Sequence, residues 1–322
     1  MQTEFLLGVD GGGTGCRARL SESSGVILGE GSAGPANIRF GLEQSFAAVL
    51  EAGMQCLYQA GLSYGDLERT IACLALAGAT EPTELAKVRA RMLPFRKTVI
   101  TTDAHAACVG AHGGRDGGIV IIGTGSVGWA RIRGRDHRVG GWGFPISDEG
   151  SGAWLGCEAV RRALWAQDGR IGWTGLLRAL FAEFQSDPHA IVRWMTDARP
   201  ADFGAFAPLI IEHASRGDPI GRELVSIAAH HIDALAARLL GSGADRLCLV
   251  GGLAPHVEPW LAGETKLHLV APEGDALTGA LQLAQAESSS MLDLIGAGEL
   301  SPGSTPDEDT EPALSPAQEP DK

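Results

Sequence analysis

Two glycine-rich turns, each placed after a short apolar run, are the segments best suited to binding a polyphosphate. The first is Asp10-Gly11-Gly12-Gly13-Thr14 and the second is Gly123-Thr124-Gly125-Ser126. Glycine has no Cβ, so backbone N–H groups in such turns can approach an anion closely. Thr14 adds a hydroxyl donor, and Asp10 could hold a hydrated Mg²⁺ that neutralises phosphate charge. One such turn could equally be a tight structural hairpin, but two of them favour a pair of loops that grip one polyphosphate from opposite sides.

The second turn also fits a dinucleotide-binding fingerprint, and we reject that interpretation. Residues 123–128 spell G-x-G-x-x-G, and Asp148 lies 20 residues further on. The fingerprint requires a helix to open at the third glycine. Residues 129–134 instead alternate in polarity as a strand does, so the pattern predicts a hairpin.

Two acidic positions could act on a polar substrate. Asp103 follows the strand-like run 98–101 and precedes an apolar helical segment, so it is either a helix cap or a base that accepts a proton from a substrate hydroxyl. Asp148 and Glu149 lie in a glycine-rich segment that also contains Trp142 and Phe144. This segment is either a helix start or a set of acceptors for sugar hydroxyls beside an aromatic ring.

The elements that must position these residues form a scheme that occurs twice. In the first half we expect strands at 5–9, 16–20, 26–28, 70–76 and 98–101, with helices at 43–60, near 83–92 and from about 104. In the second half we expect strands at 118–122, 127–133, 246–250 and 267–270, with helices at 222–240 and from about 275. The fold class is therefore α/β, with two duplicated domains that face each other.

The domain boundaries follow from this repeat and from composition. We place the first domain at 1–115 and the second at 116–286, and the helix from about 275 could pack back on the first domain. Residues 287–322 hold nine acidic residues and one basic residue, with five prolines. Such a segment buries too little apolar surface to offset the entropy of ordering, so we expect a disordered acidic tail.

Composition excludes several classes of function. The 322 residues carry 26 Lys and Arg against 39 Asp and Glu, a net charge of −13, so a nucleic-acid partner is not expected. We find no signal-peptide pattern at the first residues and no apolar stretch near the ~18 residues of a membrane span. The six cysteines are scattered, without a C-x-x-C pair or zinc spacing, which is typical of free thiols. We therefore expect a cytoplasmic protein with no membrane partner.

Seven segments together resemble one family. They are GVDGGGTGCRARL (8–20), GPANIRFG (34–41), TTDAHAA (101–107), GGIVIIGTGSVGWA (117–130), GGWGFPISDEGSGAWLG (140–156), GDPIGREL (217–224) and CLVGGL (248–253). In this order they are similar to the N-acetylglucosamine kinase and glucosamine kinase branch of the BadF/BadG/BcrA/BcrD-type ATPases. The resemblance spans residues 5–286. It implies the actin-like ATPase fold, with two RNase H-like domains hinged around an ATP and sugar cleft.

The resemblance also implies an activity, transfer of the γ-phosphate of ATP to the 6-hydroxyl of an amino sugar, with ATP and Mg²⁺ as cofactors. Asp103 matches the proposed catalytic base, and Asp10 matches the residue that manages Mg²⁺, through water. The matching nucleotide contacts are Gly12, Gly13, Thr14, Gly123, Thr124, Gly217, Gly251 and Gly252. The matching sugar contacts are Asn37, Asp103, Gly125, Ser126, Gly141, Trp142 and Asp148. Related kinases are often dimers, so a homodimer is a further expectation.

Three questions stay open at the level of sequence. The same family contains ATPases that activate 2-hydroxyacyl-CoA dehydratases through a shared [4Fe–4S] cluster, but no cysteine pair supports that reading here. A non-catalytic sugar or nucleotide-binding regulator is the second alternative, although both glycine turns and Asp103 are intact. The cysteine motif of the zinc-containing ROK kinases is absent. Finally, acidic groups at Asp148 and Glu149 would favour cationic glucosamine, whereas an apolar niche at Trp142 and Phe144 would favour N-acetylglucosamine.

Overall fold

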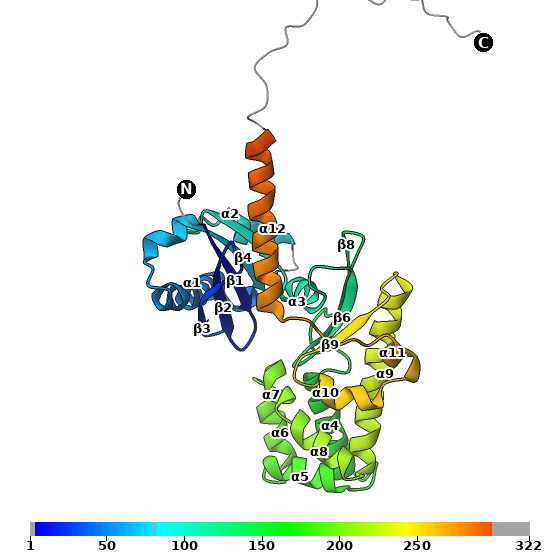
Figure 1. The fold of residues 1–322 in the computed structure, drawn as a ribbon. Coiled ribbons are helices and arrows are strands. Elements are labelled where there is room, and N and C mark those ends of the chain that lie inside the picture. The colour runs from blue at the N-terminus through cyan, green and yellow to red at the C-terminus, as the bar shows by residue number, and fades with distance from the viewer. Residues whose placement is uncertain (1–3, 80–81, 298–322) are drawn as a thin grey trace, which may run out of the picture.

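Two β-sheets, each with helices packed against it, form the frame of the protein (Figure 1). The computed structural model describes residues 4–79 and 82–297. The first sheet has the order β3-β2-β1-β4-β5. Its strands are β1 (Phe5–Gly11), β2 (Cys16–Glu22), β3 (Ile27–Ala33), β4 (Thr70–Leu76) and β5 (Lys97–Thr101). Because β1 pairs antiparallel with β2 and parallel with β4, the expected meander is joined to a parallel α/β unit.

Helices cover both faces of the first sheet, and the alternation along β1 explains why. Leu7 and Val9 belong to the core on the α1 face, whereas Leu6 belongs to a smaller core against α3 and α12. A strand buried on both faces must be apolar at nearly every position, as β1 and β4 are. The helical elements of this half are η1 (Ile38–Phe40), α1 (Leu42–Gln59), η2 (Tyr64–Arg69), α2 (Pro82–Ala90) and α3 (Asp103–Ala111), joined by the last helix α12 (Ala276–Ala297).

The second sheet repeats the first with one strand fewer. Its order is β8-β7-β6-β9, with β6 (Gly117–Ile122), β7 (Ser126–Ile132), β8 (Arg135–Gly140) and β9 (Leu247–Val250). The strand predicted at 267–270 is wrong. Only one isolated bridge forms there, between Leu247 and Leu269, and the preceding residues belong to the short helix α11 (Gly263–Leu267). Pro272 has no N–H to extend the pairing, and Leu267 is 85% exposed, so the apolar run LHLV does not mark a buried strand.

A group of helices between β8 and β9 was largely missed by the sequence patterns, which predicted only the long helix near 222–240. Helices α4 to α8 gather around α9 in the lower part of Figure 1. Most are under ten residues, so each shows too few turns for a clear period, and several begin at proline, which suits a first helical turn. The elements of this group are α4 (Gly152–Gln167), α5 (Gly175–Glu183), α6 (Pro188–Met195), α7 (Pro200–Gly204), α8 (Ala207–Ser215) and α9 (Pro219–Gly241), and the short α10 (Ala254–Val257) and η3 (Glu258–Trp260) follow β9.

In the part of the chain that the structure describes, one helix, α9, is long enough and apolar enough to cross a membrane, judged by length and composition alone. Its buried residues, which include Leu224, Ile232 and Leu239, pack in the cores of the second half. Core helices of globular proteins can have the same length and apolar composition. The apolar character of α9 is therefore explained by its packing.

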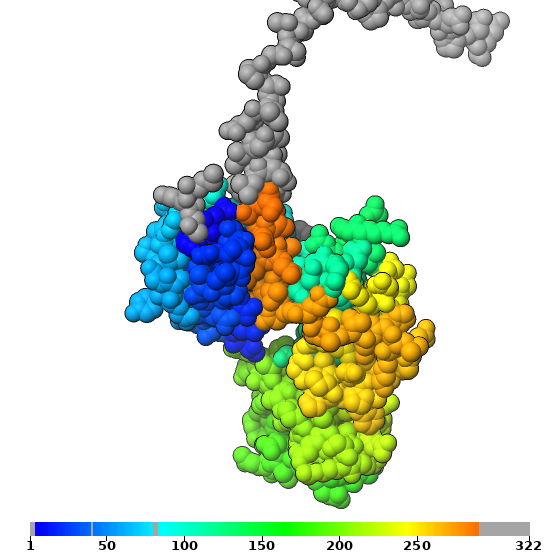
Figure 2. Space-filling view, in the orientation of Figure 1, coloured from blue at the N-terminus to red at the C-terminus, as the bar shows by residue number. Residues whose placement is uncertain are grey.

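The last helix returns to the first sheet. α12 packs against α3, β1 and β4, and it lies beside the N-terminal part in Figure 2. The helix continues to Ala297, so residues 287–297 are helical although the sequence placed them in a disordered tail. The rest of that predicted tail, from residue 298 onward, lies outside the described residues.

The crossing of α12 over α3 depends on two glycines. A Cβ built on Gly279 would lie 1.9 Å from the carbonyl oxygen of Ala106, and one on Gly110 would lie 2.0 Å from the carbonyl oxygen of Asp275. Both neighbours are backbone atoms, which cannot move without shifting a helix. The two helices are therefore in backbone contact, and any larger side chain would separate them.

We expect Gly279→Ala to destabilise the protein by about 2 kcal/mol, because overpacking a well-packed contact typically costs 1–3 kcal/mol. Alanine would otherwise favour a helix over glycine. Gly241→Ala, at the end of α9, is the matched control, since a Cβ there meets nothing within 4 Å. Chemical denaturation of both variants is the measurement. Equal stability of Gly279→Ala and the unsubstituted protein would show that the crossing can relax.

Candidate functional site

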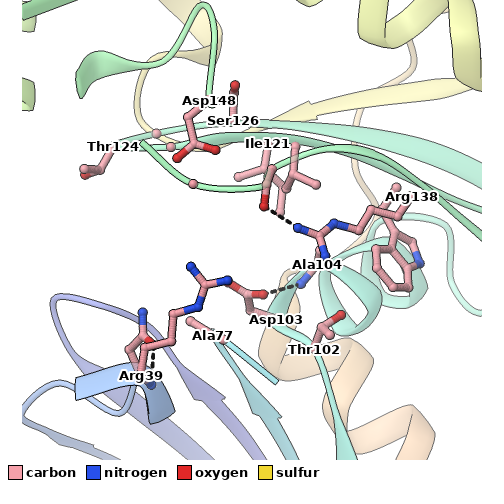
Figure 3. A pocket seen from close by; sticks show the side chains of 18 residues that line it. Arg39, Ala77, Thr102, Asp103, Ala104, Ile121, Thr124, Ser126, Arg138 and Asp148 are labelled. Carbon is pink, nitrogen blue, oxygen red and sulfur yellow. Dashed lines mark hydrogen bonds between the residues drawn. The ribbon is translucent and has the colours of Figure 1, made fainter. Parts of the chain in front are cut away.

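A cavity of about 310 Å³ lies where the two halves meet, and most residues predicted to contact a sugar line it. The first half contributes Asn37 and Asp103. The second half contributes the β6–β7 turn and Asp148, which lie across the cavity from Asp103 (Figure 3). The predicted residues that line this cavity are Asn37, Asp103, Gly123, Thr124, Gly125, Ser126, Gly141 and Asp148. Segments more than 100 residues apart in the chain thus form one polar hollow.

Asp103 is positioned by the start of α3. Thr102 is the N-cap of this helix, and its side chain accepts a hydrogen bond from the backbone N–H of His105 at 3.0 Å. Asp103 is therefore the first helical residue, and its Oδ1 accepts from the N–H of Ala104 at 2.9 Å. Since Thr102 does the capping, the cap alternative does not account for Asp103.

Burial sets the protonation of Asp103. It raises the pKa of this carboxyl, and the negative charge of Asp10 raises it further, against the lowering effects of the Ala104 N–H and of Arg138. A carboxylate with a raised pKa is a stronger base, once ionised, than an exposed carboxylate. Asp103 is thus suited to accept a proton from a hydroxyl group.

A second cavity, of about 500 Å³, adjoins the first at Asp103. Asp103 lines both cavities, and the second is also lined by Asp10, Arg17, Gly251 and Asp275. Gly251 has φ +100°, and a Cβ there would lie 2.5 Å from the carbonyl oxygen of Ile122, so only glycine fits. One carboxylate therefore faces two ligand-sized spaces, and the predicted nucleotide residues Asp10 and Gly251 lie on the side away from the sugar contacts.

Asp10 ends up beside a cation that the sequence analysis did not consider. Arg17 Nη2 donates to Asp10 Oδ2 at 2.7 Å, and Arg17 Nη1 lies 3.6 Å from Asp275. In the described part of the chain no group of three or more His, Cys, Asp or Glu residues could hold a metal ion. Asp10 still fits a Mg²⁺ that arrives with a nucleotide, because such an ion usually takes one or two carboxylates, with phosphate and water oxygens as its other ligands.

Asp148 is held in an unusual backbone conformation. Its φ is +67°, and its Oδ2 accepts from the N–H of Phe144 at 3.1 Å. Burial raises the pKa of this carboxyl, while the Phe144 N–H lowers it. A Cβ on Gly125 would lie 2.8 Å from Asp148 Oδ2, so the glycine of the β6–β7 turn makes room for the carboxylate. Backbone conformations of this kind cluster at functional sites.

Some predicted residues lie outside these two cavities. Gly12, Gly13 and Thr14 form the β1–β2 turn, which is closed by a 2.9 Å hydrogen bond from the Gly12 N–H to the Gly15 carbonyl. Gly217 lies in the α8–α9 turn with φ +90°, where the turn itself requires glycine, and Gly252 follows Gly251. Trp142 is 71% exposed and does not line the sugar-side cavity, and the Arg138 guanidinium lies over its ring at 4.3 Å. Glu149 also points elsewhere, toward Ser147.

Two arginines in the sugar-side cavity were missed. Arg39 projects from η1 and Arg138 from β8, and both line the cavity (Figure 3). Arg138 donates from Nε to the Gly140 carbonyl at 3.1 Å and from Nη2 to the Gly141 carbonyl. Burial and the like charge of Arg39 lower the pKa of Arg138. Arg39 lies two residues after Asn37 in a segment already singled out, whereas Arg138 reads as an exposed residue of a polar hairpin.

Comparison with known proteins identifies the family of the chain. The model of the BadF/BadG/BcrA/BcrD ATPase family matches residues 7–261. A glucosamine kinase from Vibrio cholerae is 40% identical over 280 residues, which cover 87% of this chain and 95% of that protein. A crystal structure from Chromobacterium violaceum, of a protein provisionally named N-acetylglucosamine kinase, superposes with a TM-score of 0.82 at 37% identity and covers 87% of this chain and 99% of that one.

A more distant structure bears on the fold alone. The ROK family glucokinase from Streptomyces griseus has a TM-score of 0.52 at 19% identity, covering 88% of this chain and 98% of that one. The prediction of an actin-like ATPase and sugar-kinase fold is confirmed by this likeness and by the duplicated sheets. With its family model matched over most of its length, the chain belongs to the BadF/BadG/BcrA/BcrD ATPase family.

Proposed function

We propose that this protein is a hexosamine kinase that transfers the γ-phosphate of ATP to the 6-hydroxyl of glucosamine or N-acetylglucosamine. The observation that carries the proposal is the position of Asp103, which lines both the sugar-side cavity and the cavity that holds Asp10 and Gly251. A base that serves phosphoryl transfer must touch the acceptor hydroxyl while facing the phosphate. The relatives described above support the class, since the Vibrio cholerae protein is named a glucosamine kinase.

In this proposal each part of the site has one task. Asn37 and Asp148 hold sugar hydroxyls in the 310 Å³ cavity, and Asp103 accepts the proton of the 6-hydroxyl as its oxygen bonds to the γ-phosphorus. The bond from that phosphorus to the β-phosphate oxygen breaks, and ADP leaves. Asp10 would hold the Mg²⁺ bound with ATP, which neutralises phosphate charge. The nucleoside lies along Gly251 and Gly252, and the β1–β2 turn and the turn at Gly123 and Thr124 approach the phosphates.

The proposal also covers the setting of the reaction. ATP and amino sugars meet in the cytoplasm, which is where we place the protein. Whether it acts as a homodimer stays a prediction.

The proposed reaction is tested by a coupled assay of ADP release with Mg·ATP and glucosamine, N-acetylglucosamine or glucose. We expect at least one amino sugar to give a kcat/KM about 100-fold above that of glucose, because a site with polar groups placed for one substituent strongly rejects a sugar that lacks it. A reaction without sugar is the control. ADP release that is independent of sugar would indicate an ATPase of the activator type, and no release would indicate a binding protein.

Asp103→Asn should lower kcat by about 100-fold or more, because a positioned general base contributes 10²–10⁴-fold. Binding of sugar and ATP, measured by calorimetry, should stay near normal. Since the pKa of Asp103 is raised in the folded protein, its ionised form costs stability at neutral pH, and the substitution should leave the melting temperature unchanged or higher. Full turnover in the variant would remove Asp103 from the mechanism.

The pH dependence follows from the same carboxyl. Asp103 acts only when ionised, so kcat/KM should fall as pH drops through a pKa that lies above the usual aspartate value of about 4. Asp148 also has a raised pKa and titrates nearby, so the profile is to be measured in Asp148→Asn as well. The acid limb should persist in that variant. An acid limb that is unchanged in the residual activity of Asp103→Asn would assign it to another group.

A further inference from the structure

The sugar-side cavity contains as many cations as carboxylates. Its charged lining among the described residues consists of Arg39 from η1, Asp103 from α3, Arg138 from β8 and Asp148 from the loop before α4. Glu149, which could have made the cavity acidic, contacts Ser147 and does not line it. The expectation of an acidic pocket that favours an ammonium group therefore has no support from this lining.

Neither arginine is neutralised by a close partner. Within residues 4–79 and 82–297, no carboxylate lies within 4.0 Å of a guanidinium nitrogen of Arg39 or Arg138. Arg138 donates its hydrogen bonds to the carbonyls of Gly140 and Gly141, and Asp103 and Asp148 act on its charge from beyond 4.0 Å. The two guanidinium groups also act on each other as like charges.

Arg39 reaches across the cleft between the halves. It begins in η1, which packs on the first sheet, and its Nη1 lies 3.4 Å from the place where a Cβ on Gly143 would be, in the loop of the second half. Gly78, which has φ +85°, lies 3.0 Å by the same measure from the Arg39 Cγ. The Arg39 side chain therefore packs over Gly78 in the first half, and its guanidinium group points toward Gly143 in the second half, beside the space where the sugar is proposed to bind.

Resting on the proposed kinase function, we infer that Arg39 selects the acceptor by charge, and that the preferred substrate carries a neutral N-acyl group at carbon 2 rather than an ammonium group. A cationic amine placed beside Arg39 meets a guanidinium group that no described carboxylate pairs within 4.0 Å, whereas the carbonyl oxygen of an acyl group can accept hydrogen bonds from it. Repulsion from unpaired like charge is an effective means of rejecting a wrong ligand. Arg39 suits a test better than Arg138 does, because Arg138 also holds the 140–141 turn.

The test is the ratio of kcat/KM for N-acetylglucosamine to that for glucosamine in the unsubstituted protein, in Arg39→Gln and in Arg39→Lys. We expect a ratio above one in the unsubstituted protein, a fall of roughly threefold to fivefold in Arg39→Gln, as for other exposed charge interactions, and little change in Arg39→Lys. Melting temperatures check that each variant is folded. An unchanged ratio in Arg39→Gln, or an equal loss in Arg39→Lys, would overturn selection by charge.

A pH series gives an independent reading, because the amine of glucosamine loses its proton just above neutral pH. In the unsubstituted protein the ratio should fall as pH rises and the amine becomes neutral, and the fall should be smaller in Arg39→Gln. A protein that prefers glucosamine at a pH where the amine is charged would refute the inference while leaving the kinase proposal intact. Turnover of neither sugar would instead refute the kinase proposal itself.

Discussion

The placement of α3 is the constraint on which the site depends. This helix packs against α12 and the first sheet on one side and against β6 and β7 of the second sheet on the other. Its N-terminus therefore lies where the two halves meet, and Asp103 is its first residue. Because Gly110 and Gly279 allow backbone contact with α12, the helix cannot slide without a clash. The position of Asp103 is thereby fixed by a packing contact at Gly110, about 10 Å further along the helix.

His105 couples the same helix to the second sheet. Its Nε2 lies 3.2 Å from Arg131 Nη1 and its Nδ1 lies 2.7 Å from Thr101 Oγ1. Since arginine can only donate, Nε2 accepts and the proton is on Nδ1, which donates to Thr101. Burial lowers the pKa of this imidazole against the raising effect of Asp136, whose Oδ1 lies 3.7 Å from Nε2, and the lowered pKa favours the neutral form that the two contacts require. The ring also stacks on Trp129 at 5.9 Å, and Trp129 lines the sugar-side cavity. His105 thus holds α3 against β5, which contains Thr101, and against β7, which contains Arg131.

The sequence allowed the frame to be predicted because the frame depends on local patterns. Short continuous apolar runs mark β1, β4 and β6, and a helical period marks α1 and α9. Sequence patterns failed to predict the elements whose secondary structure depends on tertiary contacts. The apolar run at 267–270 carries no buried face, and the short helices α5, α6 and α8 owe their stability to a shared core with α4 and α9.

The site divides in the same way. Asp103, Asp148 and the turn around Gly125 stand out by type and spacing, and the structure brings them together. Trp142 could not be placed from sequence, because whether its ring faces a sugar or the solvent depends on which groups surround it in the folded chain, where it is exposed and contacts Arg138. Arg39 and Arg138 were missed for a related reason. An arginine in a turn or on a hairpin is usually solvated, and only the approach of the other half of the molecule makes it part of a cavity.

Each half of the molecule contributes one arginine and one aspartate to that cavity. The first half supplies Arg39 and Asp103, and the second supplies Arg138 and Asp148. Any approach of the halves brings unlike charges together, but it also drives the two guanidinium groups toward each other and removes water from both carboxylates, whose pKa values burial already raises. In a cavity without ligand these effects oppose one another, so closure gains little. Sugar hydroxyls between the charges would accept from the guanidinium groups and donate to the carboxylates, replacing the lost water. In the proposed kinase, closure of the halves would then be favoured mainly when an acceptor is present, which would limit the transfer of phosphate to water.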